Sequence, residues 1–312
     1  MGDKMSESIA ILMATYNGAR YIREQIMSIQ SQTVQDWNLY IRDDGSSDGT
    51  IDIIRDFCLS DNRIHLFQDL EIHLGPKASF MKLLASINAD IYLFSDQDDV
   101  WNANKIGLTI APFHQYNDNA VDDVPVLVHT NLSVVDQDLK VLTKTLHKKN
   151  ISSNLQVLLP ANNVTGCTVA INQNLKEIAL NPNLKNIVMH DWWLALCAAS
   201  LGKIYFIQAS TMLYRQHGSN QVGTDRNFFD KIKRVFSSKK ELNIFNSSIE
   251  QAKELLRKHE HHMSAEVRNL IREYIGLLDS STRQQFSILV KYKFRKNSIL
   301  GSLWLWMMIM LK

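Results

Sequence analysis

The stretch that decides the fold is SIAILMATYNGARYIREQIMSIQSQTVQDWNLYIRDDGSSDGT, residues 8–50. Its apolar start, residues 8–14, predicts a strand, and a polar turn around Asn17 then breaks the chain. Isoleucines at helical spacing predict a helix over residues 20–32, and residues 37–42 predict a second strand. Two strands joined by a helix are the unit from which parallel sheets are built.

The alternation of strands and helices continues to residue 101. Helices are predicted over residues 51–59 and 77–88, and strands over residues 63–68 and 90–96. This order predicts an α/β fold with a mostly parallel central sheet flanked by helices, a Rossmann-like nucleotide-binding half. Ligands of such sheets bind at the carboxyl ends of the strands. We therefore expect the polar turns after strands one, two and four to converge.

The rest of the chain is less regular. Residues 124–136 predict a buried strand, residues 162–172 a strand pair with a tight turn, and residues 190–202 a helix that ends at a glycine. From residue 227 the composition is rich in lysine, glutamate and leucine, which predicts helices.

Composition excludes several classes of protein. With 45% hydrophobic and 21% charged residues, the 312-residue chain is an ordinary globular protein that can bury a sizeable core. A net charge of +2 argues against nucleic acid as a partner. Three scattered cysteines predict reduced, buried thiols in a cytosolic protein. The first residues, MGDKMSES, have no apolar core, so we expect no secretory signal.

The last fifteen residues, SILGSLWLWMMIMLK, are almost wholly apolar. They are too short to span a bilayer, which takes about 20 residues. The basic and aromatic stretch KYKFRKN directly before them favours a helix that lies in the membrane interface. The alternatives are a helix packed on the protein's own core, or on a second subunit of a homo-oligomer.

The stretch YLFSDQDDVW, residues 92–101, places Asp96, Asp98 and Asp99 at the end of the fourth predicted strand. Carboxylates this close repel each other unless a positive partner is present. Carboxylate oxygens suit Mg²⁺ or Mn²⁺, either of which can also bind the phosphates of a nucleotide. The alternative is a solvated acidic turn at the start of the next helix.

The stretch RDDGSSDGT, residues 42–50, places Asp43 and Asp44 at the end of the second strand. An acidic residue there can accept hydrogen bonds from a base or a ribose hydroxyl. Neither GxxxxGK[ST] nor GxGxxG occurs, so phosphate must be bound by a metal and by side chains. The alternative is an Asx turn with glycine at the bend.

Together with HDWWLAL at residues 190–196 and YRQHGSN at residues 214–220, these stretches resemble the family 2 glycosyltransferases, which have the GT-A fold. The resemblance covers roughly residues 9–223, and looks closest to bacterial rhamnosyltransferases of cell-wall and capsular polysaccharide synthesis. It implies an inverting transfer from a nucleotide-activated sugar with Mg²⁺ or Mn²⁺.

The resemblance also implies a role for each matching residue. The residues expected to bind the nucleotide-sugar are Thr15, Tyr16, Asn17, Asp43, Asp44, Asp96 and Asp99. The expected metal ligands are Asp98, His217 and Asp96. Asp191 is the expected catalytic base, although relatives often have Glu-Asp where this chain has His190-Asp191. The expected acceptor-binding residues are Gly166, Trp192 and Trp193, with one tryptophan facing the acceptor and the other the core.

Some of these residues have simpler explanations. Asp191 would then only cap the helix that follows it. His217 would be a hydrogen-bonded loop histidine. Lys105, shortly after the acidic cluster, would either reach a phosphate or be solvated.

The implied donor is dTDP-L-rhamnose, and the implied acceptor is a lipid-linked glycan on the cytoplasmic, inner face of the cell membrane, where the protein would be peripheral. The alternatives are a UDP-hexose donor (glucose, galactose or N-acetylglucosamine), a nucleotidyltransferase, or a non-catalytic sugar-binding subunit. We expect a GT-A domain over residues 1–225, with a donor half over 1–101 and an acceptor half over 102–225. A helical C-terminal extension over 226–312 would follow.

Overall fold

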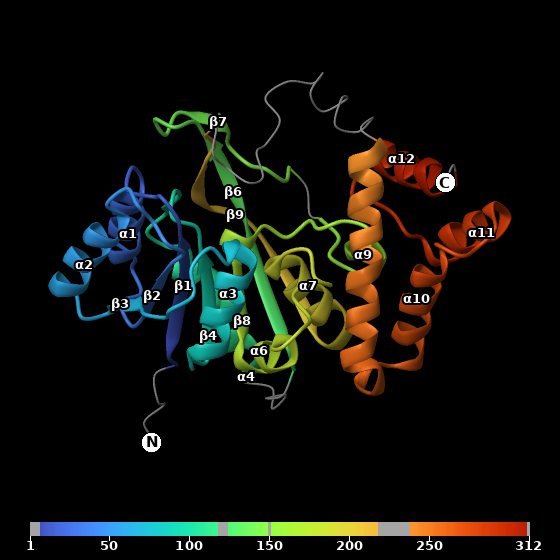
Figure 1. Cartoon of the computed structure of the whole chain (residues 1–312), viewed down its shortest axis with the longest axis horizontal. Coiled ribbons are helices and arrows are strands. Elements are labelled where there is room, and N and C mark those ends of the chain that lie inside the picture. Colours follow the sequence, from blue (N-terminus) through green and yellow to red (C-terminus); the bar gives the residue numbers. More distant parts are fainter. Residues whose placement is uncertain (1–6, 118–123, 149–150, 218–237, 311–312) are drawn as a thin grey trace. The chain divides into compact units, whose positions relative to one another are not determined.

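The structure is a computed structural model that describes residues 7–117, 124–148, 151–217 and 238–310. It contains two compact units, and the chain passes between them several times (Figure 1). The first unit comprises residues 1–150, 165–180 and 203–220, and the second comprises residues 151–164, 181–202 and 221–312. The domain division expected at residue 225 stays a prediction.

The first unit is built on one sheet with helices alongside it. Its strands are β1 (Ile9–Thr15), β2 (Asn38–Asp43), β3 (Ile64–Phe67), β4 (Ile91–Ser95), β5 (Val100–Trp101), β6 (Val126–Val135), β7 (Val141–Thr143), β8 (Val169–Asn172) and β9 (Lys203–Arg215). Its helices are α1 (Ile22–Gln30), α2 (Thr50–Ser60), α3 (Gly75–Ser86), α4 (Lys105–Asn117) and α6 (Gln173–Ala179). The alternation predicted for the first 101 residues is confirmed.

The strands follow the order β3-β2-β1-β4-β8-β6-β9-β5, and β7 pairs with β6. The strands β3, β2, β1 and β4 are parallel to one another, as predicted. β8 then runs antiparallel to both β4 and β6, so the complete sheet is mixed. The apolar residues of β1 and β4 are buried, which places the core of this unit against the sheet.

The expected strand pair over residues 162–172 is wrong. The N–H of Thr168 donates to Thr165 O at 2.9 Å and closes a short 3-10 turn over Gly166–Thr168, and only β8 follows it. The side-chain hydroxyl of Thr168 donates to the same carbonyl at 2.7 Å. These local hydrogen bonds compete with strand pairing before β8.

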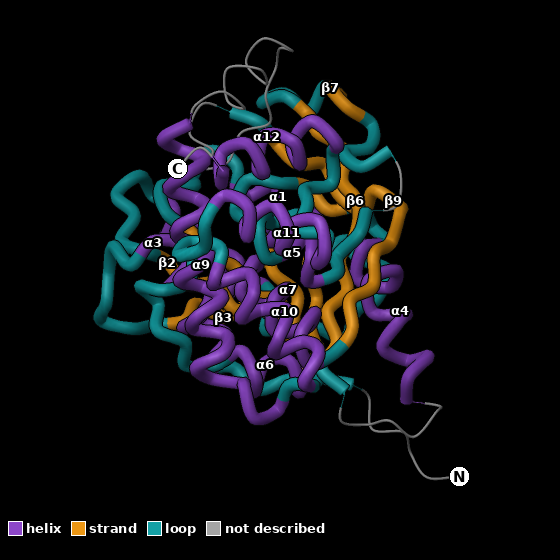
Figure 2. The backbone as a smooth tube through the Cα atoms, turned by 90° about the vertical axis from the view of Figure 1, so that its right-hand side faces the viewer, coloured by secondary structure: helices purple, strands orange, loops and turns teal. Residues whose placement is uncertain are grey.

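The second unit is helical (Figure 2). Its elements are α5 (Leu155–Leu158), α7 (His190–Leu201), α9 (Ser238–His259), the 3-10 turn Glu260–His262, α10 (Ala265–Gly276), α11 (Thr282–Tyr292) and α12 (Ile299–Met310). α7 is almost wholly buried and packs against α5 and α9, while α10 packs along α9. In the described parts of the chain, no helix is both long enough and apolar enough to cross a membrane.

Candidate active site

The polar turns after β1 and β2 meet at one end of the sheet. Thr15 and Asp43 are register partners, and the Thr15 hydroxyl donates to Asp43 Oδ2 at 2.9 Å. The backbone N–H of Asp44 donates to Thr15 O at 2.8 Å. Farther along, Asn17 N–H donates to Ser46 Oγ at 2.8 Å. The predicted convergence of these turns is confirmed.

The turn after β4 joins the same cluster through Gln97, which lies between two of the acidic residues. Its Oε1 accepts a hydrogen bond from Tyr16 N–H at 2.9 Å, and its Nε2 donates to Tyr16 O at 3.0 Å. Gly18 leaves room for this amide, because a Cβ there would lie 2.2 Å from Gln97 Oε1. Gln97 was not predicted from the sequence, because its role becomes visible only when the position of the Tyr16 backbone is known.

Asp43 organises the turn that follows β2. Its Oδ1 accepts hydrogen bonds from Gly45 N–H at 3.0 Å and Ser46 N–H at 2.8 Å, and its Oδ2 accepts from Thr15. This is the Asx turn that the sequence offered as an alternative. Contact between Asp43 and a nucleotide stays a prediction.

Asp44 lies in a buried ionic network. Its Oδ1 accepts from Arg42 Nη1 at 2.7 Å and from Leu74 N–H at 2.9 Å, and its Oδ2 accepts from Gly75 N–H at 2.8 Å. Burial opposes ionisation of Asp44, but the Arg42 guanidinium and the two backbone N–H groups hold its pKa below the usual value. Arg42 also pairs with Asp69 at 2.8 Å. Both carboxylate oxygens of Asp44 therefore accept hydrogen bonds from the start of α3. The sequence predicted a contact with a nucleotide base for Asp44, and did not predict this structural role.

Tyr16 presents an aromatic surface at this end of the sheet. Its side chain is 50% exposed, and its ring meets the His73 ring edge-on at 5.9 Å. Thr15, by contrast, is buried, and its hydroxyl is used by Asp43. In the turn after β1, the exposed ring of Tyr16 is therefore the expected nucleotide contact that is accessible to a flat ligand such as a base.

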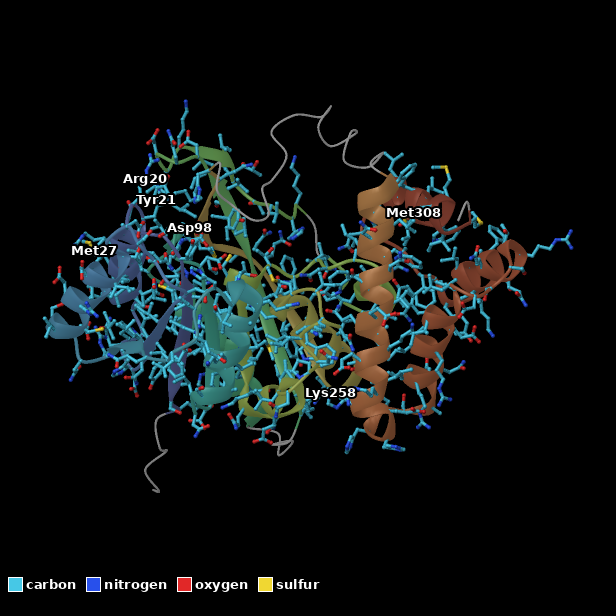
Figure 3. The ribbon with its side chains drawn as sticks, in the orientation of Figure 1. Arg20, Tyr21, Met27, Asp98, Lys258 and Met308 are labelled. Atoms are coloured by element: carbon cyan, nitrogen blue, oxygen red, sulfur yellow. The ribbon has the colours of Figure 1, made fainter. Side chains whose placement is uncertain are left out.

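Asp98 and His217 are brought together from distant parts of the sequence. The atoms Asp98 Oδ2 and His217 Nε2 are 2.8 Å apart, and both side chains are largely shielded from solvent. The His217 ring stacks on Tyr21 at 4.9 Å, and the Arg20 guanidinium lies 5.0 Å from the same Tyr21 ring. Figure 3 shows Arg20, Tyr21 and Asp98 close together. The structure thus brings Asp98 and His217 into direct contact. Their role as metal ligands stays a prediction.

Arg215 fixes the backbone of the acidic turn, and sequence analysis did not single it out. Its Nε donates to Asp98 O at 2.9 Å, and its backbone N–H donates to Asp99 Oδ1 at 3.0 Å. Its guanidinium also pairs with Glu24 and lies 4.7 Å from the Tyr21 ring centroid. The sequence signal for Arg215 was its place two residues before His217 in YRQH.

Asp99 and Cys167 are buried next to Asp96. One ligand atom from each of these three side chains lies within 4.8 Å of the other two. Burial raises the pKa of Asp99 well above its usual value, and the charges of Asp98 and Asp96 raise it further. Burial likewise raises the pKa of the Cys167 thiol. Cys167 is adjacent to Gly166, so this glycine lies beside the acidic cluster.

Lys105 is buried, which corrects both expectations for it. Its Nζ donates to Cys167 O at 3.1 Å and to Thr211 Oγ1 at 3.4 Å, and lies 4.8 Å from the Trp101 ring centroid. Burial lowers the pKa of Lys105 to about 8, although the charge of Asp99 acts in the opposite direction. Lys105 is thus a cation inside the core beside the acidic cluster.

The donor set fits a hard divalent cation. Asp98 carries carboxylate oxygens, and the His217 ring nitrogen lies next to one of them. The ligand atom of Asp96 lies near those of Asp99 and Cys167. Mg²⁺ and Mn²⁺ accept such ligands, and a buried, protonated Cys167 thiol does not suit them. The acidic cluster therefore favours the cation type that the sequence predicted.

Asp191 lies in the second unit, in the first turn of α7. The helix begins at His190 with Met189 as its N-cap, so Asp191 is not the cap that the simpler explanation required. Asp191 Oδ1 accepts a hydrogen bond from Trp192 N–H at 2.7 Å. The first turn of a helix is a favourable place for a carboxylate. Burial lowers the pKa of His190 to about 3, so this neighbour is neutral at physiological pH.

We expected one of Trp192 and Trp193 to face the acceptor, but the structure buries both side chains. Trp193 is fully buried, Trp192 is 4% exposed, and Trp192 Nε1 donates to Leu158 O at 2.6 Å. Neither ring offers an open face on which a sugar could stack. These side chains are core residues because α7 is apolar on every side.

Helix α9 holds the segment that leads into α7. Gln251 Oε1 accepts from Val188 N–H at 2.9 Å, and Glu254 Oε1 accepts from Asn183 N–H at 2.8 Å. A hydrogen bond with Arg257, followed by those with Asn183 and other neighbours, lowers the pKa of Glu254 to about 2 despite burial. Residues of α9 thus fix the backbone directly before Asp191.

Comparison with known proteins identifies the family. The model of "Glycosyl transferase family 2" matches residues 10–172. The protein described as "dTDP-rhamnosyl transferase RfbG" of Shigella flexneri is 32% identical over 239 residues, which cover 72% of this chain and 78% of that protein. The Escherichia coli protein "UDP-Glc:alpha-D-GlcNAc-diphosphoundecaprenol beta-1,3-glucosyltransferase WfgD" is 34% identical over 103 residues, 33% of this chain and 40% of that protein.

Solved structures support the fold. The crystal structure of S. aureus TarS 1–349 in complex with UDP-GlcNAc superposes with a TM-score of 0.59 at 14% identity, and covers 91% of this chain and 80% of that one. The predicted α/β fold of the GT-A type is confirmed. Family model, relatives and fold agree, and the chain belongs to glycosyl transferase family 2.

Proposed function

We propose that this protein is an inverting, metal-dependent glycosyltransferase that moves L-rhamnose from dTDP-β-L-rhamnose to a lipid-linked glycan. The observation that carries the proposal is the Asp98–His217 pair at the carboxyl end of β4, within an acidic cluster that Arg215 and Gln97 position. That end of the sheet is where α/β folds bind nucleotides.

In the proposed reaction, Asp191 accepts the proton of the acceptor hydroxyl while that oxygen attacks the anomeric carbon of the sugar. The new carbon–oxygen bond forms on the face opposite the departing phosphate oxygen, whose bond breaks with its electron pair. A β-linked donor therefore gives an α-linked product. Asp191 is the acidic residue of the first turn of α7, a favourable position for a carboxylate.

The donor would be held at the strand ends. Tyr16 would contact the base, with Asp43, Asp44 and Asn17 shaping the surrounding turn. Asp98, His217 and Asp96 would bind the divalent cation, and Asp99 would support the acidic turn from within. Bound there, Mg²⁺ or Mn²⁺ would supply positive charge for the leaving diphosphate.

The donor sugar is proposed from the relative described as a dTDP-rhamnosyl transferase, which aligns with 72% of this chain. A UDP-hexose donor is the second candidate, because the E. coli glucosyltransferase matches a shorter part of the chain. That protein's name includes a diphosphoundecaprenol acceptor. It supports our proposal of a lipid-linked acceptor in cell-wall or capsular polysaccharide synthesis, with the enzyme peripheral on the inner face of the cell membrane.

A panel of nucleotide-sugars tests the donor. Purified protein with Mn²⁺ is incubated with dTDP-L-rhamnose, UDP-glucose, UDP-galactose or UDP-N-acetylglucosamine, and release of each nucleoside diphosphate is measured with membrane lipid extract as the acceptor source. We expect release from dTDP-L-rhamnose to dominate. Release from a UDP-sugar alone would refute the rhamnose assignment.

Two variants test the proposed residues. Asp98→Asn should weaken Mn²⁺ binding and lower kcat/KM by roughly a hundredfold, because a ligand to the charge-stabilising cation is lost. Asp191→Asn should abolish transfer and leave dTDP binding by calorimetry unchanged. Asp138→Asn, an exposed residue between β6 and β7, is the matched control. If the wild-type protein binds nucleotide-sugars but transfers no sugar from any of them, the result would favour the alternative of a non-catalytic sugar-binding subunit.

A further inference from the structure

The last two helices of the second unit expose apolar side chains. Among the described residues of this unit, every strongly exposed large hydrophobic side chain lies on α11 or α12. These six side chains, which we name the apolar face, are Phe286, Val290, Ile299, Leu300, Leu303 and Met307. Ile299 and Leu300 are 82% and 79% exposed. Such a concentration of exposed apolar area is unusual on a protein that contacts only water.

The apolar face follows the geometry of its helices. Ile299, Leu303 and Met307 are spaced four residues apart on α12, so they lie along one side of that helix. Leu305 and Ile309 belong to the other side, which is buried. Because α12 is apolar all round, packing within the unit buries one side of the helix and leaves other apolar side chains exposed.

Helix α11 extends the same surface. Phe286 and Val290 are 52% and 48% exposed and lie one turn apart. The Phe286 ring meets the Trp306 ring edge-on, with centroids 6.4 Å apart, and so connects the two helices. Trp306 Nε1 in turn donates to Phe294 O at 2.7 Å, which anchors α12 to the segment before it.

The chain segment that carries the apolar face contains charges of one sign only. Residues 280–312 contain six basic residues and no aspartate or glutamate. Of these, Arg283, Lys291, Lys293 and Arg295 are exposed. Lys296 differs, because it pairs with Glu241 at 2.6 Å. Exposed cations beside exposed apolar side chains complement a lipid surface whose headgroups are anionic and whose acyl chains, just below the headgroups, are apolar.

We propose that the apolar face and its exposed cations form a docking surface for an anionic lipid membrane, with α12 lying in the plane of the interface. The apolar side chains would enter the boundary between headgroups and acyl chains, and the cations would meet anionic headgroups. Trp306, between the two helices, is a residue type suited to that depth. The proposal deepens the membrane location in the proposed function, because it names the surface that makes the contact, and it does not depend on the donor.

Co-sedimentation of the full chain with vesicles tests the proposal. Vesicles of equal parts phosphatidylglycerol and phosphatidylcholine are compared with vesicles of phosphatidylcholine alone, at low and high salt. We expect binding to the anionic vesicles that is at least about tenfold tighter and weakens with salt, since each cation near the surface contributes to affinity.

Two variants separate the apolar and ionic parts of the surface. Leu300→Ser with Leu303→Ser keeps the cations, and Lys291→Gln, Lys293→Gln and Arg295→Gln together keep the apolar face. Each should reduce binding to anionic vesicles by about tenfold or more. Leu59→Ser with Leu70→Ser is the matched control, because these leucines are 89% and 101% exposed in the first unit. Circular dichroism confirms that each variant is folded.

Three results would overturn the proposal. Undiminished vesicle binding by the leucine variant would remove the apolar face from the contact. Equal binding to neutral and anionic vesicles would remove the cations. The third result is that the wild-type protein binds neither kind of vesicle but forms a dimer in sedimentation velocity, and that the leucine substitutions abolish this dimer. The apolar face would then be a contact with a second copy of this chain.

Discussion

Gln97 pairs with the backbone of Tyr16 through both ends of its amide, at 2.9 and 3.0 Å. Gln97 separates Asp96 from Asp98, so this pairing couples the acidic turn after β4 to the aromatic turn after β1. A change that breaks this pairing should alter both turns, although Gln97 is not one of the proposed metal ligands.

Replacement of Gln97 by leucine removes both hydrogen bonds with little change in volume. Two hydrogen bonds of about 1 kcal/mol each correspond to roughly thirtyfold weaker binding of the nucleotide, which isothermal titration calorimetry with dTDP and Mn²⁺ measures. Gln30→Leu is the control, because its amide donates to Asp61, in the loop after α2. Equal losses in the two variants would show that the effect is not local to the turn.

Gly18→Ala should act through the same amide. The new Cβ would meet Gln97 Oε1 at 2.2 Å, so the amide must leave Tyr16. In a Gln97→Ala background that obstacle is gone, and Gly18→Ala should then cost little. Nucleotide affinities of the two single variants and the double variant form a cycle. Additive losses would contradict the coupling.

The lowered pKa of Lys105 predicts that the free energy of unfolding increases with pH in the alkaline range. Its folded pKa of about 8 lies below the usual 10.5, so the unfolded chain binds more protons between these values. Stability from this group therefore increases as pH rises from 8 to 10.5, and the cost of the buried charge is fully present below pH 8. Lys105→Met lacks this dependence. The difference in unfolding free energy between wild type and variant should shift by about 3 kcal/mol across the window.

Urea unfolding at several pH values measures the Lys105 effect. Lys253→Met is the control, because that lysine is on the surface and pairs with Glu250 at 2.8 Å. A difference between wild type and Lys105→Met that is flat from neutral pH to about pH 10 would mean that Lys105 titrates as in the unfolded chain.

Glu254 predicts the opposite behaviour in acid. Its folded pKa of about 2 is below the usual 4.5, so its stabilisation is present above pH 4.5 and is lost as pH falls toward 2. Glu254→Gln should lower the unfolding free energy by up to about 3 kcal/mol at neutral pH, with the deficit shrinking in acid. Unfolding curves of both proteins at neutral and acidic pH measure this deficit. Glu250→Gln, at an exposed position of α9, should change neither.

The first half of the fold was predictable because its signals are local. Apolar strands and isoleucines at helical spacing define β1 and α1 without knowledge of any partner. The convergence of the polar turns followed from topology alone, since parallel strands end on the same edge. Asp98 and His217, 119 positions apart, were assigned to one site by the family resemblance and not by spacing.

The rest depended on contacts between distant segments. Nothing near Lys105 in the sequence shows that Cys167 and Thr211 would enclose it, and a lysine in that position is more often solvated. Trp192 and Trp193 look suited to a sugar because aromatic rings stack on sugars. Their burial follows from packing on both sides of α7, which the sequence of a uniformly apolar helix leaves open.

The hydrogen bonds from α9 to the segment before α7 bear on how this chain can be recombined. A protein truncated after residue 225 would keep Asp191 but lose Gln251 and Glu254, which accept from the backbone N–H groups of Val188 and Asn183. A chimera that joins the first 225 residues to the C-terminal helices of a relative would meet the same difficulty. Exchangeable modules in this protein must therefore carry α7 and α9 from the same parent.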